Sequence, residues 1–262
     1  MALGPCGHTV PVEELRIELD SGAEVVAYRS SPESSTAPTV VLLHGIGMTH
    51  RTFEALQPLL GEELSVISLD LPGFGTTRKP PHPFTVDDHA QAVDEALDRL
   101  GVGRRILVGH SMGCQFAVEQ AILHPDEVAG LVLVAPVVDS GRRRLPAQAR
   151  DLAVDTFREP PRANARVIVD YATCGLRWYL ATLKAMFDYD TEAQLRRVTC
   201  DVVVLRGERD PVSREPWCRK LVGVAAKGTL VSVPGHAHCV PLTSPQPVAD
   251  AVHRLLRDAR TA

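Results

Sequence analysis

A serine at position 111 lies in a setting that could make it a nucleophile. It is the centre of the pentapeptide GHSMG (residues 109–113), which follows the apolar run 106–108 and precedes a helix-like run over 114–124. In the order strand, G-x-S-x-G, helix, the serine occupies a strained turn and its hydroxyl projects from the edge of the sheet. The flanking glycines let the strand and the helix pass closely. Because a short motif also occurs by chance, the assignment depends on partners for Ser111 elsewhere in the chain.

An aspartate and two histidines are placed where they could serve Ser111. A serine hydroxyl needs a base to remove its proton and a carboxylate to orient that base. Asp210 follows an apolar run at 201–205, and His236 and His238 follow the last apolar run, 229–233. The carboxyl ends of parallel strands share one edge of a sheet, where ligands bind, so we expect these side chains near Ser111. The chain order Ser, Asp, His is also the one expected for a serine in such a turn.

The composition is that of an ordinary soluble globular protein. The chain has 262 residues, of which 45% are hydrophobic and 23% charged, and a formal net charge of -4. Neither nucleic acid nor an anionic membrane is expected as a partner of such a chain. The N-terminus lacks a basic segment followed by an apolar core, and no later apolar run approaches the length of a membrane span. We expect a cytoplasmic protein with no membrane partner.

The cysteines give no sign of a metal or redox site. They are Cys6, Cys114, Cys174, Cys200, Cys218 and Cys239. None of them shows the C-x-x-C spacing of a zinc site or a redox pair. Reduced, buried cysteines are expected instead. The sequence predicts no metal and no cofactor.

Apolar runs alternate with helix-like segments through most of the chain, which predicts a parallel sheet with helices on both faces. Strands are expected at 15–19, 24–28, 39–43, 64–69, 106–108, 128–134, 201–205 and 229–233, and helices at 52–60, 86–100, 114–124 and 247–258. The first two strands flank Asp20-Ser21-Gly22 and should form a hairpin. Thr85 and Asp88 resemble a capping box at the start of the second helix.

The alternation stops between residues 138 and 198. This stretch is polar and helix-like, and it contains a central cluster of aromatic and apolar side chains. Such an interruption predicts a helical insertion, or cap, over one end of the sheet. We therefore expect a core domain formed by residues 1–137 and 199–262 and a cap formed by residues 138–198.

Five pieces of the chain, each following an expected strand, occur in a familiar order. They are HGIG (44–47), DLPGFG (70–75), GHSMG (109–113), RGERD (206–210) and PGHAHCVPLTSP (234–245). In these motifs the chain resembles the α/β-hydrolase fold superfamily, in its capped serine-hydrolase branch. The resemblance implies an α/β fold: a mostly parallel eight-stranded sheet, helices on both faces, and a small helical cap inserted after strand 6.

The resemblance also implies roles for the candidate residues. Ser111 matches the nucleophile, and Asp210 matches the triad acid in the family's commoner pattern. Asp139, which follows the strand before the cap, is the alternative acid, because some relatives carry the acid there. Aligning the family's final proline with Pro245 places the base at His238, with His236 as the alternative. Asp70 is expected to fix a loop.

Two further groups of site residues follow from the same motifs. The oxyanion hole should consist of the backbone N–H groups of Met112, the residue after the nucleophile, and Ile46 in the loop after the 39–43 strand. Six residues are candidates for the substrate pocket: His44, Gly45, His110, Trp178, Tyr179 and Phe187. The three aromatic residues of the cap could instead pack the cap onto the core.

These expectations together describe a metal-free serine hydrolase. It would cleave a small or medium carboxylic ester, lactone or thioester through an acyl-enzyme on Ser111. Its partner would be a small-molecule acyl substrate, and it could act as a monomer or a homo-oligomer. If the histidine is unperturbed, hydrolysis should fade below a pH of about 6.5.

Other functions remain open on the same residues. A carbon–carbon bond hydrolase of ring-cleavage products, a perhydrolase or an acyltransferase would use the same triad, because a fold does not decide a reaction. A non-catalytic ligand receptor with a hydrolase fold is the alternative of another class. It is disfavoured because a receptor has no chemical need for Ser, Asp and His together.

Overall fold

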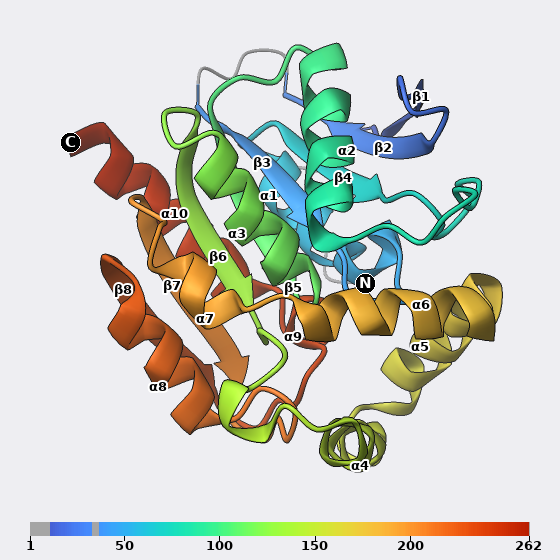
Figure 1. The fold of residues 1–262 in the computed structure, drawn as a ribbon. Helices are drawn as coiled ribbons and strands as arrows, with labels where there is room; N and C mark the ends of the chain where they lie inside the picture. The colour runs from blue at the N-terminus through green and yellow to red at the C-terminus, as the bar shows by residue number, and fades with distance from the viewer. Residues whose placement is uncertain (1–10, 33–36, 262) are drawn as a thin grey trace.

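One eight-stranded sheet runs through the protein, and helices cover both of its faces (Figure 1). The computed structural model describes residues 11–32 and 37–261. The strands are β1 (Glu13–Glu18), β2 (Glu24–Ser30), β3 (Thr39–Leu43), β4 (Val66–Asp70), β5 (Arg105–His110), β6 (Val128–Val134), β7 (Asp201–Gly207) and β8 (Lys227–Val233). Their lateral order is β1-β2-β4-β3-β5-β6-β7-β8, with β1 and β2 antiparallel to their neighbours and β3 to β8 parallel. The predicted mostly parallel, eight-stranded sheet with helices on both faces is confirmed.

The sheet separates two hydrophobic cores. The α-helices outside the connection between β6 and β7 are α1 (Leu56–Gly61), α2 (Val86–Arg99), α3 (Gly113–Leu123), α8 (Glu215–Val224), α9 (Val240–Thr243) and α10 (Gln246–Thr261). Helices α2, α3 and α8 pack on one face, and α1 and α10 pack on the other. Alternate residues of β3 accordingly enter opposite cores, with Val41 on the first face and Val40 on the second. A strand buried on both faces needs apolar residues throughout, which is why the strands read as continuous apolar runs.

Local signals in the sequence differ in how well they predicted the elements. The capping box is present, since Asp88 N donates to Thr85 Oγ1 at 3.1 Å and Thr85 N donates to Asp88 Oδ2 at 2.8 Å. The helix expected at 52–60 is instead a 3-10 turn, η1 (His50–Phe53), followed by α1. Pro58 lacks an N–H group and is tolerated only in the first turn of an α-helix, so α1 cannot begin much earlier. Helix α8 was not predicted.

The chain between β6 and β7, hereafter the insertion (residues 138–198), contains helices and no strand. Its elements are η2 (Ser140–Arg142), α4 (Leu145–Thr156), α5 (Pro161–Cys174), α6 (Leu176–Asp188) and α7 (Thr191–Leu195). Figure 1 shows α4, α5 and α6 at the end of the sheet where the parallel strands finish. The short helix α7 instead contacts α3 and α8. The last part of the insertion therefore lies on a face of the sheet.

The five cysteines in the described residues are free thiols. They are Cys114, Cys174, Cys200, Cys218 and Cys239, and all but the partly buried Cys200 are buried; Cys6 lies outside the described residues. Among the described helices, none has both the length and the apolar character needed to cross a membrane.

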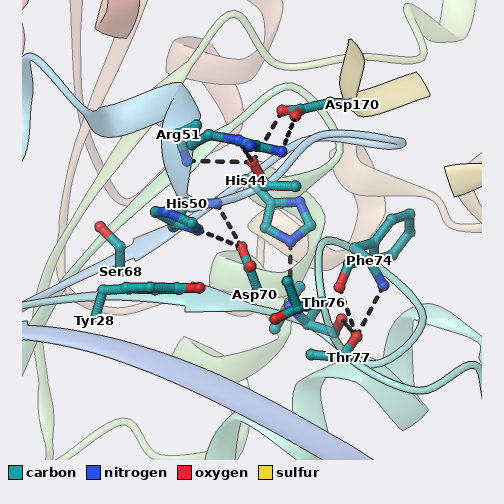
Figure 2. Close-up of polar contacts among 12 residues, drawn as sticks. Tyr28, His44, His50, Arg51, Ser68, Asp70, Phe74, Thr76, Thr77 and Asp170 are labelled. Carbon is teal, nitrogen blue, oxygen red and sulfur yellow. Dashed lines mark hydrogen bonds and ion pairs between the residues drawn. The ribbon is translucent and has the colours of Figure 1, made fainter. Parts of the chain in front are cut away.

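A buried carboxylate on α5 ties the insertion to the core (Figure 2). Asp170 accepts hydrogen bonds from Thr49 Oγ1 at 2.9 Å and from Arg51 Nη2 at 2.7 Å, both in the segment after β3. A second pair, Arg166 Nη2 with Glu54 Oε2 at 2.5 Å, joins the same two segments but is half-exposed. A buried charge is costly unless it is paired, so the first pair should matter more for stability.

Arg51→Met should lower the free energy of unfolding by about 1–3 kcal/mol, because it leaves Asp170 buried with only the Thr49 hydroxyl as a partner. Arg166→Met is the matched control and should cost about 0.5 kcal/mol or less, as is usual for exposed pairs. Urea denaturation of the two variants measures both values. Equal losses of unfolding free energy in the two variants would show that the buried Asp170 pair stabilises the fold no more than the half-exposed pair does.

Candidate active site

Ser111 sits in a strained turn between β5 and α3. Its φ of 56° lies in the left-handed region that non-glycine residues rarely adopt, at a typical cost of about 1–3 kcal/mol. The turn is held by Ser111 N, which donates to Val134 O at 2.9 Å, and by Cys114 N, which donates to Ser111 O at 3.1 Å. The residue is 7% exposed. The local geometry is the one expected of a serine whose hydroxyl is presented at the sheet edge.

The two glycines of the GHSMG motif are required by close backbone contacts. A Cβ atom on Gly109 would overlap the backbone of Gly113 and Cys114. A Cβ atom on Gly113 would overlap the backbone carbonyls of Leu43 and His44, at the end of β3. Strand β5, helix α3 and the end of β3 therefore meet at Ser111 at a separation that leaves no room for side chains.

His238 and Asp210 form a buried pair beyond the ends of β8 and β7. His238 Nδ1 lies 2.9 Å from Asp210 Oδ2. The other carboxylate oxygen, Oδ1, accepts hydrogen bonds from Val212 N at 2.7 Å and from Ser213 N at 2.9 Å. The aspartate is thus fixed on both oxygens, and it holds the imidazole through Nδ1, which leaves Nε2 for a further contact.

The pKa values of this pair move in opposite directions. Burial alone would lower the pKa of His238, but the charge and the hydrogen bond of Asp210, with smaller contributions from Asp155 and Glu159, together outweigh burial and raise the pKa to about 9. Burial would likewise raise the pKa of Asp210, yet the His238 ring and the two backbone N–H groups hold it below its ordinary value. The pair therefore favours a charged imidazolium beside a charged carboxylate.

Ser111 and His238 line the same cavity, which has a volume of about 420 Å³. Its wall comes partly from the strand ends and partly from α4, α5 and α6 of the insertion. Ser111 Oγ makes no hydrogen bond within the described part of the chain. The serine hydroxyl and the His238 ring are therefore not hydrogen-bonded to each other in this structure. Such contacts between a nucleophile and its base are often long and tighten when substrate binds.

The alternative acid Asp139, the alternative base His236 and the loop residue Asp70 have other hydrogen-bond partners. His236 Nδ1 faces Thr243 Oγ1 at 3.2 Å. Asp139 accepts from Arg214 Nη2 at 2.7 Å and caps η2 through Gly141 N at 2.9 Å. Asp70 accepts from the backbone and the ring of His50, at 2.6 and 3.0 Å, as drawn in Figure 2. Each therefore stabilises a loop near its own strand.

The two backbone N–H groups expected in the oxyanion hole belong to the residue after Ser111 and to the loop after β3. Met112 is the N-cap residue of α3, and Ile46 lines the cavity. The loop that carries Ile46 lies against Ser111, since a Cβ atom on Gly45 would be 2.9 Å from Ser111 Cβ. Within the described residues, neither N–H is bonded to a protein acceptor. Two donors beside the serine are thus available to an oxygen of a substrate.

Four of the six predicted pocket residues line the cavity, and two do not. The four are Gly45, His110, Tyr179 and Phe187. His44 is fully buried, and its Nε2 accepts from Leu71 N at 3.2 Å while Nδ1 lies 2.8 Å from Gly45 O, so it joins two loops (Figure 2). Trp178 packs on Gly73, where a Cβ atom would overlap the indole. The indole of Trp178 therefore joins α6 to the core.

Two acidic residues of the insertion lie at the site, although none of the sequence motifs predicted them. Asp155 Oδ1 accepts from His238 N at 3.1 Å, and Glu159 Oε1 accepts from Cys239 N at 2.6 Å. Both residues line the cavity and are less than one-tenth exposed. In the sequence they are ordinary polar residues of a polar helix, which are usually solvated. Among the described residues, no group of three or more His, Cys, Asp and Glu side chains is arranged to hold a metal ion.

Comparisons with known proteins show which family the chain belongs to. The model of the Alpha/beta hydrolase family matches residues 40–251, which is most of the chain. A curated relative, 2-(acetamidomethylene)succinate hydrolase of Mesorhizobium japonicum, is 24% identical over 251 residues, and the match covers 84% of this chain and 88% of the relative.

Solved structures show the same fold. An esterase from Thermogutta terrifontis has a TM-score of 0.79 at 23% identity, with 94% of this chain and 99% of that chain covered. The enol-lactonase from Burkholderia xenovorans LB400 has a TM-score of 0.79 at 19% identity, with 93% and 100% covered. The chain is therefore a member of the alpha/beta hydrolase family of enzymes.

Proposed function

We propose that the protein is a serine hydrolase that cleaves a small or medium carboxylic ester, lactone or thioester. The observation that carries this proposal is the convergence of two features on one cavity. One is Ser111 in its strained turn, and the other is His238, whose Nδ1 is hydrogen-bonded to buried Asp210. A nucleophile, a base and a group that orients the base are the parts that acyl transfer through an acyl-enzyme requires.

Acylation begins when His238 Nε2 takes the proton of Ser111 Oγ and the oxygen attacks the carbonyl carbon of the substrate. The carbonyl oxygen becomes an oxyanion, which the N–H groups of Ile46 and Met112 stabilise. When the tetrahedral intermediate collapses, the bond to the leaving oxygen or sulfur breaks. The leaving group takes the proton from His238, and the acyl group stays on Ser111.

Deacylation repeats these steps with water. His238 removes a proton from a water molecule, whose oxygen attacks the acyl carbon of the ester on Ser111. The same two N–H groups stabilise the second oxyanion. When it collapses, the bond between the acyl carbon and Ser111 Oγ breaks, His238 returns its proton to Oγ, and the carboxylic acid is released. Asp210 remains ionised throughout and keeps the imidazole oriented.

The insertion acts in this proposal as the cap of a core domain formed by residues 1–137 and 199–262. Its helices α4, α5 and α6 provide more than half of the residues that line the cavity. Most of these are apolar, such as Leu152, Leu183 and Met186. An apolar, covered cavity of this size suits a small or medium acyl substrate.

The charge of the cavity narrows the substrate class. Apart from histidine, the charged residues that line it are Asp155 and Glu159, and none of the described lining residues is Lys or Arg. A carboxylate on the substrate would face two carboxylates of the protein and no Lys or Arg side chain among the described lining residues, and the His238 imidazolium is already paired with Asp210. The substrate should therefore be neutral or cationic, unlike the succinate in the name of the curated relative.

A fluorophosphonate probe should label the protein on Ser111, and Ser111→Ala should abolish the labelling, because only an activated serine reacts. His238→Ala should reduce labelling and ester hydrolysis by more than about 10³-fold, as removal of a triad base does. His236→Ala is the matched control and should keep most of the activity. Labelling of Ser111→Ala at the native rate would refute the serine-hydrolase mechanism, and loss of activity in His236→Ala alone would move the base to His236.

The value of kcat/KM should rise with pH through a midpoint near 9, because His238, whose pKa is raised to about 9, must lose its proton before it can act as the base. This replaces the midpoint of about 6.5 expected for an unperturbed histidine. Ester hydrolysis between pH 6 and 10, corrected with Ser111→Ala for spontaneous hydrolysis, measures the midpoint. A midpoint near 6.5 would show that the carboxylates do not stabilise the imidazolium.

An anionic ester should be a poorer substrate than neutral or cationic esters of the same length. Suitable p-nitrophenyl esters are those of pentanoic acid, of glutaric acid as its monoester, and of 4-(trimethylammonio)butanoic acid. We expect kcat/KM for the glutarate monoester to be lower by about tenfold or more, which corresponds to about 1.4 kcal/mol. If the glutarate monoester is the best of the three, the proposed charge selectivity is wrong.

A further inference from the structure

Two carboxylates, Asp155 on α4 and Glu159 in the loop between α4 and α5, contact the backbone that carries His238. Asp155 Oδ1 accepts from His238 N at 3.1 Å, and Glu159 Oε1 accepts from the next backbone N–H, that of Cys239, at 2.6 Å. Asp155 is 4% exposed and Glu159 is 7% exposed. The mechanism proposed above uses neither side chain.

Anchoring a loop does not require charge, and here charge is costly. Burial raises the pKa of Asp155 to about 6 and raises that of Glu159 as well, with the nearby Asp210 adding to both effects. Glu159 Oε2 has no hydrogen-bond partner in the described part of the chain. A neutral amide would accept the same backbone hydrogen bonds without this penalty. The negative charges therefore need another explanation, and the nearest group that gains from them is the His238 ring.

The surroundings of His238 contain three acids and no described basic side chain of Lys or Arg in the cavity wall. Asp210 faces the ring from the loop after β7, and Asp155 and Glu159 face it from the insertion. His110, at the end of β5, lies with its ring centroid 5.1 Å from that of His238, and burial lowers its pKa to about 3, so it is neutral. Burial also raises the pKa of the adjacent Cys239 thiol, which is therefore neutral too.

We propose that Asp155 and Glu159 are positioning residues of the insertion: they fix the backbone of the general base, and their charges stabilise the imidazolium that forms on His238 in each step of acyl transfer. This inference rests on the serine-hydrolase function proposed above. It makes the cap part of the catalytic apparatus, because any displacement of α4 and the loop after it from the core removes both the anchor and the charge from His238. It also implies an alkaline working range, since the same charges delay the release of the free base.

The experiment distinguishes the effect of the carboxylate charges from the effect of their hydrogen bonds to the backbone. Asp155→Asn and Glu159→Gln keep an oxygen that can accept the backbone hydrogen bond but remove the charge. Asp151→Asn is the matched control, because Asp151 lies one turn earlier on α4, is buried, and pairs with Arg142 at 2.7 Å rather than lining the cavity. The readout is the pH midpoint of kcat/KM on a neutral p-nitrophenyl ester.

We expect each isosteric variant to lower the midpoint by about 0.5–1 pH unit, and the double variant to lower it further, because a nearby negative charge favours the protonated imidazole. Asp151→Asn should keep the native midpoint. Asp155→Ala, which also removes the acceptor, should lower kcat at every pH more than Asp155→Asn does. A native midpoint in the double variant would overturn the proposal, because a purely structural role leaves the midpoint unchanged.

A second measurement does not depend on activity. In the Ser111→Ala background, an NMR titration of the His238 ring should show the same downward shifts when Asp155 and Glu159 are replaced. Absence of the shift in a folded variant also overturns the inference. Its failure is distinguishable from failure of the proposed function: if Ser111 still reacts with the fluorophosphonate while the midpoint stays fixed, only the role of Asp155 and Glu159 is wrong.

Discussion

The hydrogen bond between His238 Nδ1 and Asp210 Oδ2 is the interaction on which the rest of the site depends. It exists because β7 and β8 are parallel neighbours whose carboxyl ends release two loops side by side. The bond orients the imidazole, keeps Asp210 ionised despite its burial, and makes His238 a stronger base than a free histidine. Its energy is large because water is excluded, and the same exclusion makes an unpaired group there costly.

Carboxylates of the insertion meet hydrogen-bond donors of the core at two separate places. Asp170 on α5 accepts from Thr49 and Arg51, where a cationic partner neutralises it. Among the described residues, Asp155 and Glu159 accept only from backbone N–H groups, so no cationic side chain there cancels their negative charge. The first contact is a structural anchor. The second leaves a negative potential beside His238, and this difference in partners is the reason to assign them different roles.

The cavity links catalysis with substrate choice, because the same acidic residues line it and contact the backbone of the base. In the proposed mechanism the strained serine, the backbone donors and the His–Asp pair determine the type of reaction. The insertion provides much of the wall of the cavity above Ser111 and so its shape and charge. A fold common to an esterase and an enol-lactonase is consistent with this division, because function resides in sites rather than in the fold.

The sequence by itself determined the order of the eight strands, the capping box and the strand-end positions of Ser111, Asp210 and His238, because these depend on local patterns of apolar residues, glycines and caps. Only the tertiary structure decided that His236 turns to Thr243, that Trp178 packs on Gly73, and that Asp155 and Glu159 reach the His238 loop. The contacts of Trp178, Asp155 and Glu159 join segments that are distant in the chain, and no local pattern encodes them. The raised pKa of His238 was unpredictable for the same reason, since it arises from charges on separate elements that meet only in the folded protein.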